Sequence, residues 1–324
     1  MRKLALSALL MSFVVLTGFG AVTNAQNPNN NGSGYRVSPV REEKTIERGT
    51  SIVTKLYVEN TTNSPVETKA IINNFVADGE TGEPKVDVEN KLEISNDFRK
   101  IVSPIPNFNL NPKERKEIPV ILTVPKDSSP GGYYGAIRFL PASTSTEDAK
   151  VNLSASVGTI FLINVPGNLT EKLSLADFAV TNNGKQGFLF VNATNGLATT
   201  IKLQNTGNIH LKPFGKVQIT KSGKVVEEFE LNDQQSGSGN VLPGQTRAFE
   251  HKFKNDKWFG KYTVSANLSY GDGGDLITAN KTFWVVPTWL AVLSVITLAA
   301  LVFGAIYFFA KKSSKGKTSV HKRR

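Results

Sequence analysis

The chain offers few side chains that could carry out acid–base or nucleophilic chemistry. It has three histidines and no cysteine, and two of the histidines, His210 and His251, precede the apolar run near the C-terminus. There is no Gly-x-Ser-x-Gly elbow, no His-Glu-x-x-His motif and no phosphate-binding glycine loop. His210 lies between Ile209 and Leu211, which is more typical of a turn or strand residue than of a general base. We therefore expect no catalytic residue; the alternative is a serine–histidine pair assembled in space.

The spacing of acidic residues also gives little support for a metal site. Two acidic stretches that contain glycine, Asp78–Glu80 and Gly271–Asp275, carry oxygen atoms that Ca²⁺ could accept as ligands. Neither has the spacing of a known calcium loop, so hairpin turns are the preferred interpretation. We expect neither a metal ion nor a cofactor.

One segment combines residue types that suit ligand binding. The run from Pro130 to Gly135 joins glycines, which permit tight turns and close backbone approach, with two aromatic rings that carry hydroxyls. Such rings can stack on sugars. The candidate ligand contacts are Gly132, Tyr133, Tyr134 and Arg138. The structural alternative is that one tyrosine fills a core and the other covers a sheet edge.

Short strand-like segments separated by Pro, Gly and Asn turns must position these residues. They cover 51–58, 66–76, 117–124, 132–140 and 157–165 in the first half, and 178–181, 187–192, 199–204, 215–221, 225–231, 247–254, 260–270 and 276–285 in the second. This spacing is typical of antiparallel sandwiches. Pro119 cannot donate to a ladder, so its strand starts late or lies at a sheet edge. Segment 90–106 is either a short helical turn or an extended insertion.

The predicted fold is all-β: two tandem immunoglobulin-like antiparallel β-sandwiches followed by a single C-terminal transmembrane helix. The assigned ranges are 1–25 for a signal peptide, 26–34 for a flexible leader, 35–168 for the first sandwich, 169–284 for the second, 285–310 for the transmembrane helix and 311–324 for a basic cytoplasmic tail. We expect 169–175 to cross between the sandwiches. The polar turns Asn60-Thr61-Thr62 and Asn205-Thr206-Gly207 each follow an early strand, which indicates two units of similar design.

The helix prediction rests on an apolar run without charges between Lys281 and Lys311. About twenty apolar residues rising 1.5 Å each match a hydrocarbon layer roughly 30 Å thick. The expected anchor residues at the two membrane interfaces are Trp284, Trp289, Tyr307, Lys311 and Lys312. The basic tail predicts a single-pass type I protein of the cell membrane, with the tail in the cytoplasm and both sandwiches outside. A buried core helix is the alternative.

The N-terminus agrees with this topology. Arg2 and Lys3 precede an apolar run and small residues that end at Ala25, typical of a secretory signal peptide; an uncleaved N-terminal anchor is the alternative. The net charge is +11, but two of the 38 basic residues lie in this segment and seven in the tail, whereas all 27 acidic residues lie between them. The exported part is nearly neutral and has no basic run interleaved with aromatic residues, so nucleic-acid binding is not expected.

Several segments share a pattern with a known group of proteins. The most specific is 130–137, Pro-Gly-Gly-Tyr-Tyr-Gly-Ala-Ile; the supporting ones are Val37-Ser38-Pro39, Asn60-Thr61-Thr62, Gly158-Thr159-Ile160 and Asn205–Leu211 with Pro213 and Gly215. With these segments the chain resembles the WxL-interacting protein family of bacterial cell surfaces over nearly its whole mature length. It departs from the pattern at Arg48-Gly49, where Pro-Gly is expected. The resemblance implies a non-enzymatic surface protein whose first domain binds peptidoglycan and whose second binds proteins, either WxL-domain partners or host surfaces.

These observations predict a membrane-anchored, non-enzymatic bacterial cell-surface binding or scaffold protein that attaches to peptidoglycan, to surface partner proteins, or to both. The alternative is an adhesin or assembly factor that binds only protein partners, through exposed strand edges. An envelope hydrolase is a third class.

Overall fold

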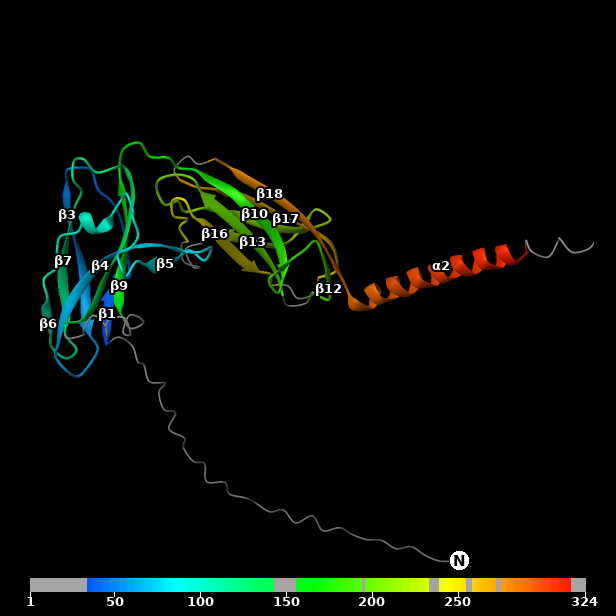
Figure 1. Cartoon of the computed structure of the whole chain (residues 1–324), viewed down its shortest axis with the longest axis horizontal. Coiled ribbons are helices and arrows are strands. Elements are labelled where there is room, and N and C mark those ends of the chain that lie inside the picture. The colour runs from blue at the N-terminus through cyan, green and yellow to red at the C-terminus, as the bar shows by residue number, and fades with distance from the viewer. Residues whose placement is uncertain are drawn as a thin grey trace, which may run out of the picture.

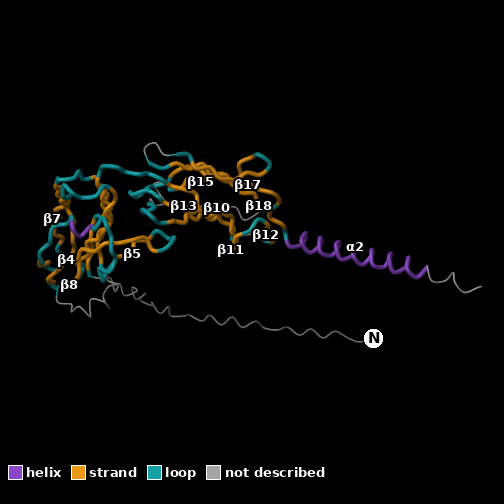
Figure 2. Tube along the Cα trace, turned by 45° about the horizontal axis from the view of Figure 1, so that its top comes forward, coloured by secondary structure: helices purple, strands orange, loops and turns teal. Residues whose placement is uncertain are grey.

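The computed structural model describes residues 34–142, 156–193, 196–232, 239–254, 258–271 and 275–315 of the chain. The predicted signal peptide, nearly all of the leader and most of the basic tail lie outside the described residues, as do most of the loops 141–150 and 271–275. The described part contains two groups of strands that lie side by side, and one long helix leads away from the second group (Figure 1, Figure 2).

The first group of strands forms two sheets around one core, and we call it the first unit. One sheet has the order β1-β3-β7 and the other β2-β9-β8-β4-β5, with β6 paired to β4. The strands are β1 Tyr35–Ser38, β2 Arg41–Thr45, β3 Ser51–Asn60, β4 Val66–Asp78, β5 Glu83–Val86, β6 Phe108–Leu110, β7 Arg115–Thr123, β8 Gly131–Pro141 and β9 Val157–Val165. Both sheets contribute fully buried side chains, among them Leu56 and Val120 from one and Ile137 and Phe161 from the other.

The second group, the second unit, repeats this arrangement. Its sheets have the orders β11-β10-β13-β16 and β12-β18-β17-β14-β15. The strands are β10 Leu173–Asn182, β11 Lys185–Gln186, β12 Leu189–Val191, β13 Leu197–Asn205, β14 Phe214–Lys221, β15 Lys224–Leu231, β16 Thr246–Lys252, β17 Gly260–Ser269 and β18 Ile277–Val286. Ile201 from one sheet and Val217, Val264 and Phe283 from the other are fully buried in its core.

The coarse fold prediction, a mostly β chain with one apolar C-terminal helix, is confirmed, and the immunoglobulin-like assignment stays a prediction. The expectation of purely antiparallel sheets is wrong, because β2 pairs with β9 and β12 with β18 in parallel. In the first pair the chain changes sheet. Only two residues separate β1 from β2, yet β1 joins the smaller sheet and β2 joins the larger one.

The strands that sequence reasoning missed are β1, β2, β5, β6 and β11. Each is two to five residues long, and β2 reads Arg-Glu-Glu-Lys-Thr, with no apolar side chain to reveal a period. Pro119 lies within β7, which is an edge strand, so the edge alternative is correct. Strand β10 begins at Leu173, so the crossing between the units is confined to 166–172.

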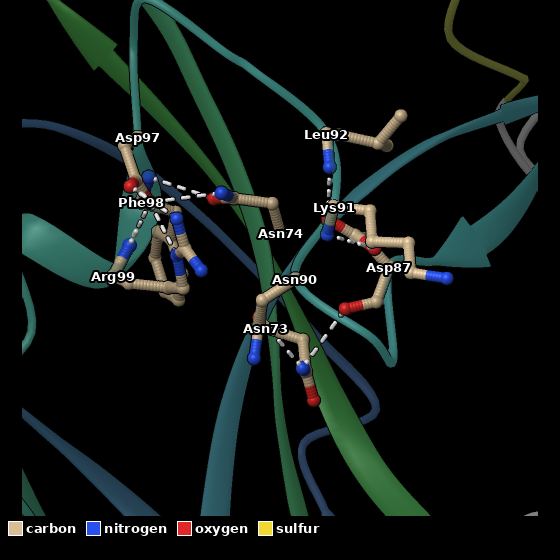
Figure 3. A network of polar contacts seen from close by, with 9 residues as sticks. All are labelled: Asn73, Asn74, Asp87, Asn90, Lys91, Leu92, Asp97, Phe98 and Arg99. Atoms are coloured by element: carbon tan, nitrogen blue, oxygen red, sulfur yellow. Dashed lines mark hydrogen bonds and ion pairs between the residues drawn. The ribbon is translucent and has the colours of Figure 1, made fainter.

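Segment 90–106 contains a single turn of 3-10 helix, η1 Phe98–Lys100, capped by Asp97. Asn74 of β4 fixes this turn. Its Oδ1 accepts the Phe98 N–H at 2.9 Å and its Nδ2 donates to Asp97 Oδ1 at 2.8 Å (Figure 3). Since Phe98 is fully buried, the turn closes one side of the first core.

Helix α2 spans Thr288–Lys315. It begins three residues later than predicted because Val285 and Val286 continue strand β18. The part Thr288–Lys311 is long and apolar enough to cross a membrane, by length and composition, and none of it is buried against the described chain.

A buried asparagine ends an early strand in each unit. Asn60 Nδ2 donates to the carbonyls of Ser64 and Asn111 at 2.8 and 3.0 Å, and its Oδ1 accepts the Thr62 N–H at 2.9 Å. Asn205 Nδ2 donates to the carbonyls of Ile209 and Val241 at 2.7 and 2.8 Å. Both residues are fully buried, so the similarity of the two polar turns reflects one shared hydrogen-bonding device.

We expect Asn60→Ala to lower the free energy of unfolding by about 3 kcal/mol, because it leaves buried backbone carbonyls and an N–H without partners. Urea denaturation of the full chain in detergent measures this. The matched control is Asn109→Ala, at an exposed position of β6, for which a change within about 0.5 kcal/mol is expected. Equal stability of the two variants would contradict the role given to Asn60.

Candidate functional site

Strand β8 sends the predicted ligand contacts to its two opposite faces, because side chains alternate along a strand. Tyr133 points into the first core with Ile137 and Phe139. It is 5 % exposed, and its hydroxyl donates to the Ser129 carbonyl at 3.0 Å. The core covers its ring, so the structural alternative, a core tyrosine, describes this residue. Tyr134 lies on the other face, toward the second unit.

The glycines on either side of the two tyrosines make room for rings. A Cβ atom at Gly132 would overlap the hydroxyl of Tyr134, and one at Gly135 would overlap the ring of Phe98. The Gly-Tyr-Tyr-Gly motif therefore has a packing explanation on both faces of the strand. One glycine seats the η1 turn on the first core, and the other seats Tyr134 against the junction of the two units.

At this junction three side chains form a polar chain across the units. Glu43 of β2 approaches His210 Nε2 with its Oε1 at 2.6 Å, and the Tyr134 hydroxyl lies 3.3 Å from His210 Nδ1. The His210 side chain is 3 % exposed. With Nε2–H donating to the carboxylate, Nδ1 is left to accept the Tyr134 O–H. His210 thus acts as a bridge between the units and is closed to solvent.

The protein environment shifts the pKa values of two of these groups. The hydrogen bond with His210 lowers the pKa of Glu43 from 4.5 to about 2, and the nearby charge of Arg41 acts in the same direction. Burial raises the pKa of Tyr134 well above its usual value of 10.0. Glu43 is therefore a carboxylate and Tyr134 a neutral phenol at neutral pH.

The junction has further contacts beside this polar chain. The Gly132 N–H donates to the Asn208 carbonyl at 2.9 Å. Phe75 of β4 and Leu242 of the second unit belong to one small buried cluster that also includes Leu162. The units are thus joined by a backbone hydrogen bond, a polar chain and an apolar contact.

The β4–β5 hairpin makes a second bridge between the units. Its turn carries Glu80, whose carbonyl accepts the Ala248 N–H at 2.8 Å and whose carboxylate pairs with Lys202 at 2.7 Å. Arg247 donates to the Gly82 carbonyl at 3.4 Å. In Figure 1 the hairpin reaches from the first unit toward β16. The hairpin-turn interpretation of the stretch at Asp78–Glu80 is therefore confirmed.

A cleft of about 330 Å³ opens beside these contacts, and we call it the elbow cleft. Its walls are apolar, amide and hydroxyl-bearing side chains together with glycines, and none of the lining residues is charged. The lining residues are Phe75, Val76, Ala77, Ile94, Ser95, Asn96, Gly132, Tyr134, Gly207, Asn208, Leu242, Pro243 and Gln245. Two of the predicted ligand contacts, Gly132 and Tyr134, thus border the cleft. Sequence reasoning missed the second-unit wall, because those residues lie more than seventy positions farther along the chain.

One wall of the elbow cleft is a strand edge. The Asp87 N–H donates to the Asn74 carbonyl at 2.8 Å, so the backbone N–H and C=O groups of Asn74 face β5. In an antiparallel pair such bonds alternate, so Val76 also faces β5, while the backbone groups of Ala77 point the opposite way. On that side the pairing of β4 with β8 ends at Asn74 and Gly135. No other described strand pairs with β4 there, and Ala77 is left facing the cleft.

The remaining predicted residues lie elsewhere. Arg138 is buried on the same face of β8 as Tyr134, beside a separate pocket. Trp284 belongs to β18, while Trp289, Tyr307, Lys311 and Lys312 belong to α2. His251 of β16 stacks on Phe229, and the two ring centroids lie 3.6 Å apart.

We expect Glu43 to make the stability of the folded chain depend on pH. Its pKa is lower in the folded chain than its ordinary 4.5, so its contribution to stability is complete above about pH 4.5 and is lost as the pH falls toward about 2. Thermal unfolding of the full chain between pH 2 and 6 should show this loss, and Glu43→Gln should flatten it. Glu93→Gln, at an exposed position, is the control. An unchanged pH profile in Glu43→Gln would contradict the bridge.

No protein-family model and no curated protein matches the chain. Among solved structures it is similar to the class 5 fimbriae chaperone CfaA, with 16% identity, 77% of this chain and 98% of that chain covered and a TM-score of 0.34. It is also similar to the chaperone YadV, with 11% identity, 77% of this chain and 100% of that chain covered and a TM-score of 0.34. A third similar structure is a CsuC–CsuE chaperone–tip adhesion subunit complex of Acinetobacter baumannii, with 16% identity, 78% of this chain and 99% of that chain covered and a TM-score of 0.35. Identities and TM-scores this low assign the chain neither a family nor a ligand.

Proposed function

We propose that this chain is a membrane-anchored, non-enzymatic binding protein that captures an extended segment of a protein partner at the elbow cleft. The observation that carries the proposal is the edge of β4 at Ala77 on the side away from β5, where no other described strand pairs, set in an uncharged cleft between two units. An added strand gains main-chain hydrogen bonds from such an edge, and flanking pockets select its side chains. This corresponds to the predicted alternative, a protein that binds partners through strand edges.

The composition of the cleft supports a polypeptide ligand. Phe75, Leu242 and Pro243 supply apolar surface, and the amides of Asn96, Asn208 and Gln245 can pair with a peptide backbone. The contacts that join the two units lie beside the cleft, so its walls are held in place before a ligand arrives. A preformed site reduces the ordering cost of binding.

The non-enzymatic part of the proposal rests on the two histidines of the described strands and turns. His210 is enclosed between the units, and His251 is stacked on Phe229 and bonded to Glu227 at 3.2 Å. Neither is placed to activate a serine hydroxyl that faces solvent. The resemblance to WxL-interacting proteins suggests WxL-domain proteins and peptidoglycan as ligands, and the experiment below separates protein from glycan.

The test is photo-crosslinking at Gln245, on the rim of the cleft, in the full chain within its native membrane. We expect an adduct that muramidase leaves unchanged and in which mass spectrometry finds peptides of a second protein. Ala77→Pro should lower its yield about five-fold, because one inter-strand hydrogen bond is worth about 1 kcal/mol. Ala77 lies opposite Pro84 at a position of β4 whose backbone makes no hydrogen bond to β5. Ala77→Pro therefore leaves the hydrogen bonds of the β4–β5 hairpin intact.

The control is the same crosslinker at Val225, which is exposed on β15 far from the cleft; it should give no such adduct. An adduct that loses its added mass to muramidase and contains no peptides of a second protein would show a glycan ligand and overturn the proposal. An unchanged yield in Ala77→Pro would overturn the role of the strand edge.

We also propose a single-pass type I topology, with both units outside the cell. It is supported by the span Thr288–Lys311 and by the basic residues that follow it. Because the chain has no cysteine, single thiols can report on sides of the membrane. A membrane-impermeant maleimide should label Asn63→Cys in intact cells and should label Ser319→Cys only after lysis. The reverse pattern would refute this topology.

A further inference from the structure

Arg138 is a buried cation whose partners are all neutral. It is 7 % exposed. Its Nε and Nη2 donate to Asn73 Oδ1 at 3.1 and 2.8 Å, and its Nη1 donates to Ser156 Oγ at 3.2 Å. No carboxylate of the described residues forms an ion pair with it. Burial lowers the pKa of Arg138, as expected for a guanidinium removed from water without a counter-charge.

The hydrogen bonds of Arg138 leave donors to spare. A guanidinium carries five N–H groups, and three of them donate here, so the terminal nitrogens Nη1 and Nη2 retain one each. Each of the two terminal nitrogens can therefore donate one further hydrogen bond to a ligand. A carboxylate accepts such a pair with both of its oxygens.

The surrounding residues hold this fork in place. Asn73 Nδ2 donates to the Asp87 carbonyl at 3.0 Å and to Asn90 Oδ1 at 3.1 Å (Figure 3). These bonds fix the amide with its Oδ1 toward Arg138. On β9, Gly158 lies directly opposite Arg138. A Cβ atom there would lie 2.5 Å from the Ile137 carbonyl oxygen and 3.0 Å from Arg138 Cγ. Glycine therefore leaves room for both the backbone of β8 and the side chain of Arg138.

The fork borders a pocket of about 370 Å³ whose other walls are mainly apolar. Pro84, Val86 and Val88 form one side, and Ala136 and Ile160 form the sheet side. Arg138 is the one charged residue among those that line it. The pocket thus combines one buried positive charge with a surface suited to a short aliphatic group.

We propose that this pocket binds a peptide carboxyl terminus, with the carboxylate on the Arg138 fork and the terminal aliphatic side chain against the valines. A single planar fork matches a planar monoanion, whereas a phosphate dianion would call for a second cation. This site is separate from the elbow cleft and does not depend on strand capture there.

The test uses the full chain in detergent and isothermal titration with N-acetyl-valyl-alanine as the probe. Its C-terminal amide is the matched control, since it keeps the shape and removes the charge. We expect the free acid to bind about ten-fold to one-hundred-fold more tightly, because charge-assisted hydrogen bonds are the ones lost. Equal affinities, or no binding of the acid, would overturn the proposal.

Two variants test the location. Arg138→Met should abolish the preference for the acid. Val88→Trp should block binding by filling the pocket, and it leaves the bonds between Arg138 and Asn73 intact, so it decides the matter if Arg138→Met does not fold. Val53→Trp, at an exposed valine of β3 on the other sheet, should bind like the wild type. Unchanged binding by Val88→Trp would overturn the assignment, whatever crosslinking at Gln245 shows.

Discussion

The side-chain amide of Asn205 is the constraint on which the second-unit wall of the elbow cleft depends. It ends β13 and ties together two turns, because it donates to the Ile209 carbonyl in one and to the Val241 carbonyl in the other. Its backbone N–H donates to the Gln245 carbonyl at 3.0 Å. The first turn carries Asn208 and His210, which contact the first unit, and the second carries Leu242. One buried amide therefore controls both local stability and the junction of the units.

Strand β8 has a matching role in the first unit. Its inward side chains fill the first core, and its outward ones meet the second unit and the Arg138 pocket. A shift of one residue in its pairing would exchange these two sets, because the side-chain period of a strand is two. The glycines beside Tyr134 and Phe98 work against such a shift, since each of them leaves space for one particular ring.

The sequence carried the strand pattern and the apolar helix, because both depend on local periodicity. It also singled out Gly132 and Tyr134, which border the elbow cleft, and their role as ligand contacts stays a prediction. It did not reveal β2, whose five residues are polar and whose pairing is decided by where β9 lies. Nor did it assign a bridging role to His210. Its partners Glu43 and Tyr134 are 167 and 76 residues away in the chain, and no local signal encodes a contact of that kind.

Arg138 and Arg247 both donate to neutral groups, but they differ in a way that bears on function. Arg247 donates to the carbonyls of Asn240 and Gly82, and its guanidinium lies 5.4 Å from the ring centroid of Phe249. Its neutral partners come from both units, so its burial is explained by the bridge that it forms. The partners of Arg138, which are Asn73 and Ser156, both belong to the first unit, so its hydrogen bonds do not link the two units. A desolvated charge is costly unless something is gained from it. For Arg247, contact between the units offsets the free-energy cost of desolvation. For Arg138, either a bound ligand or the stability of the sheet has to offset it, and peptide binding by Val88→Trp distinguishes these two explanations.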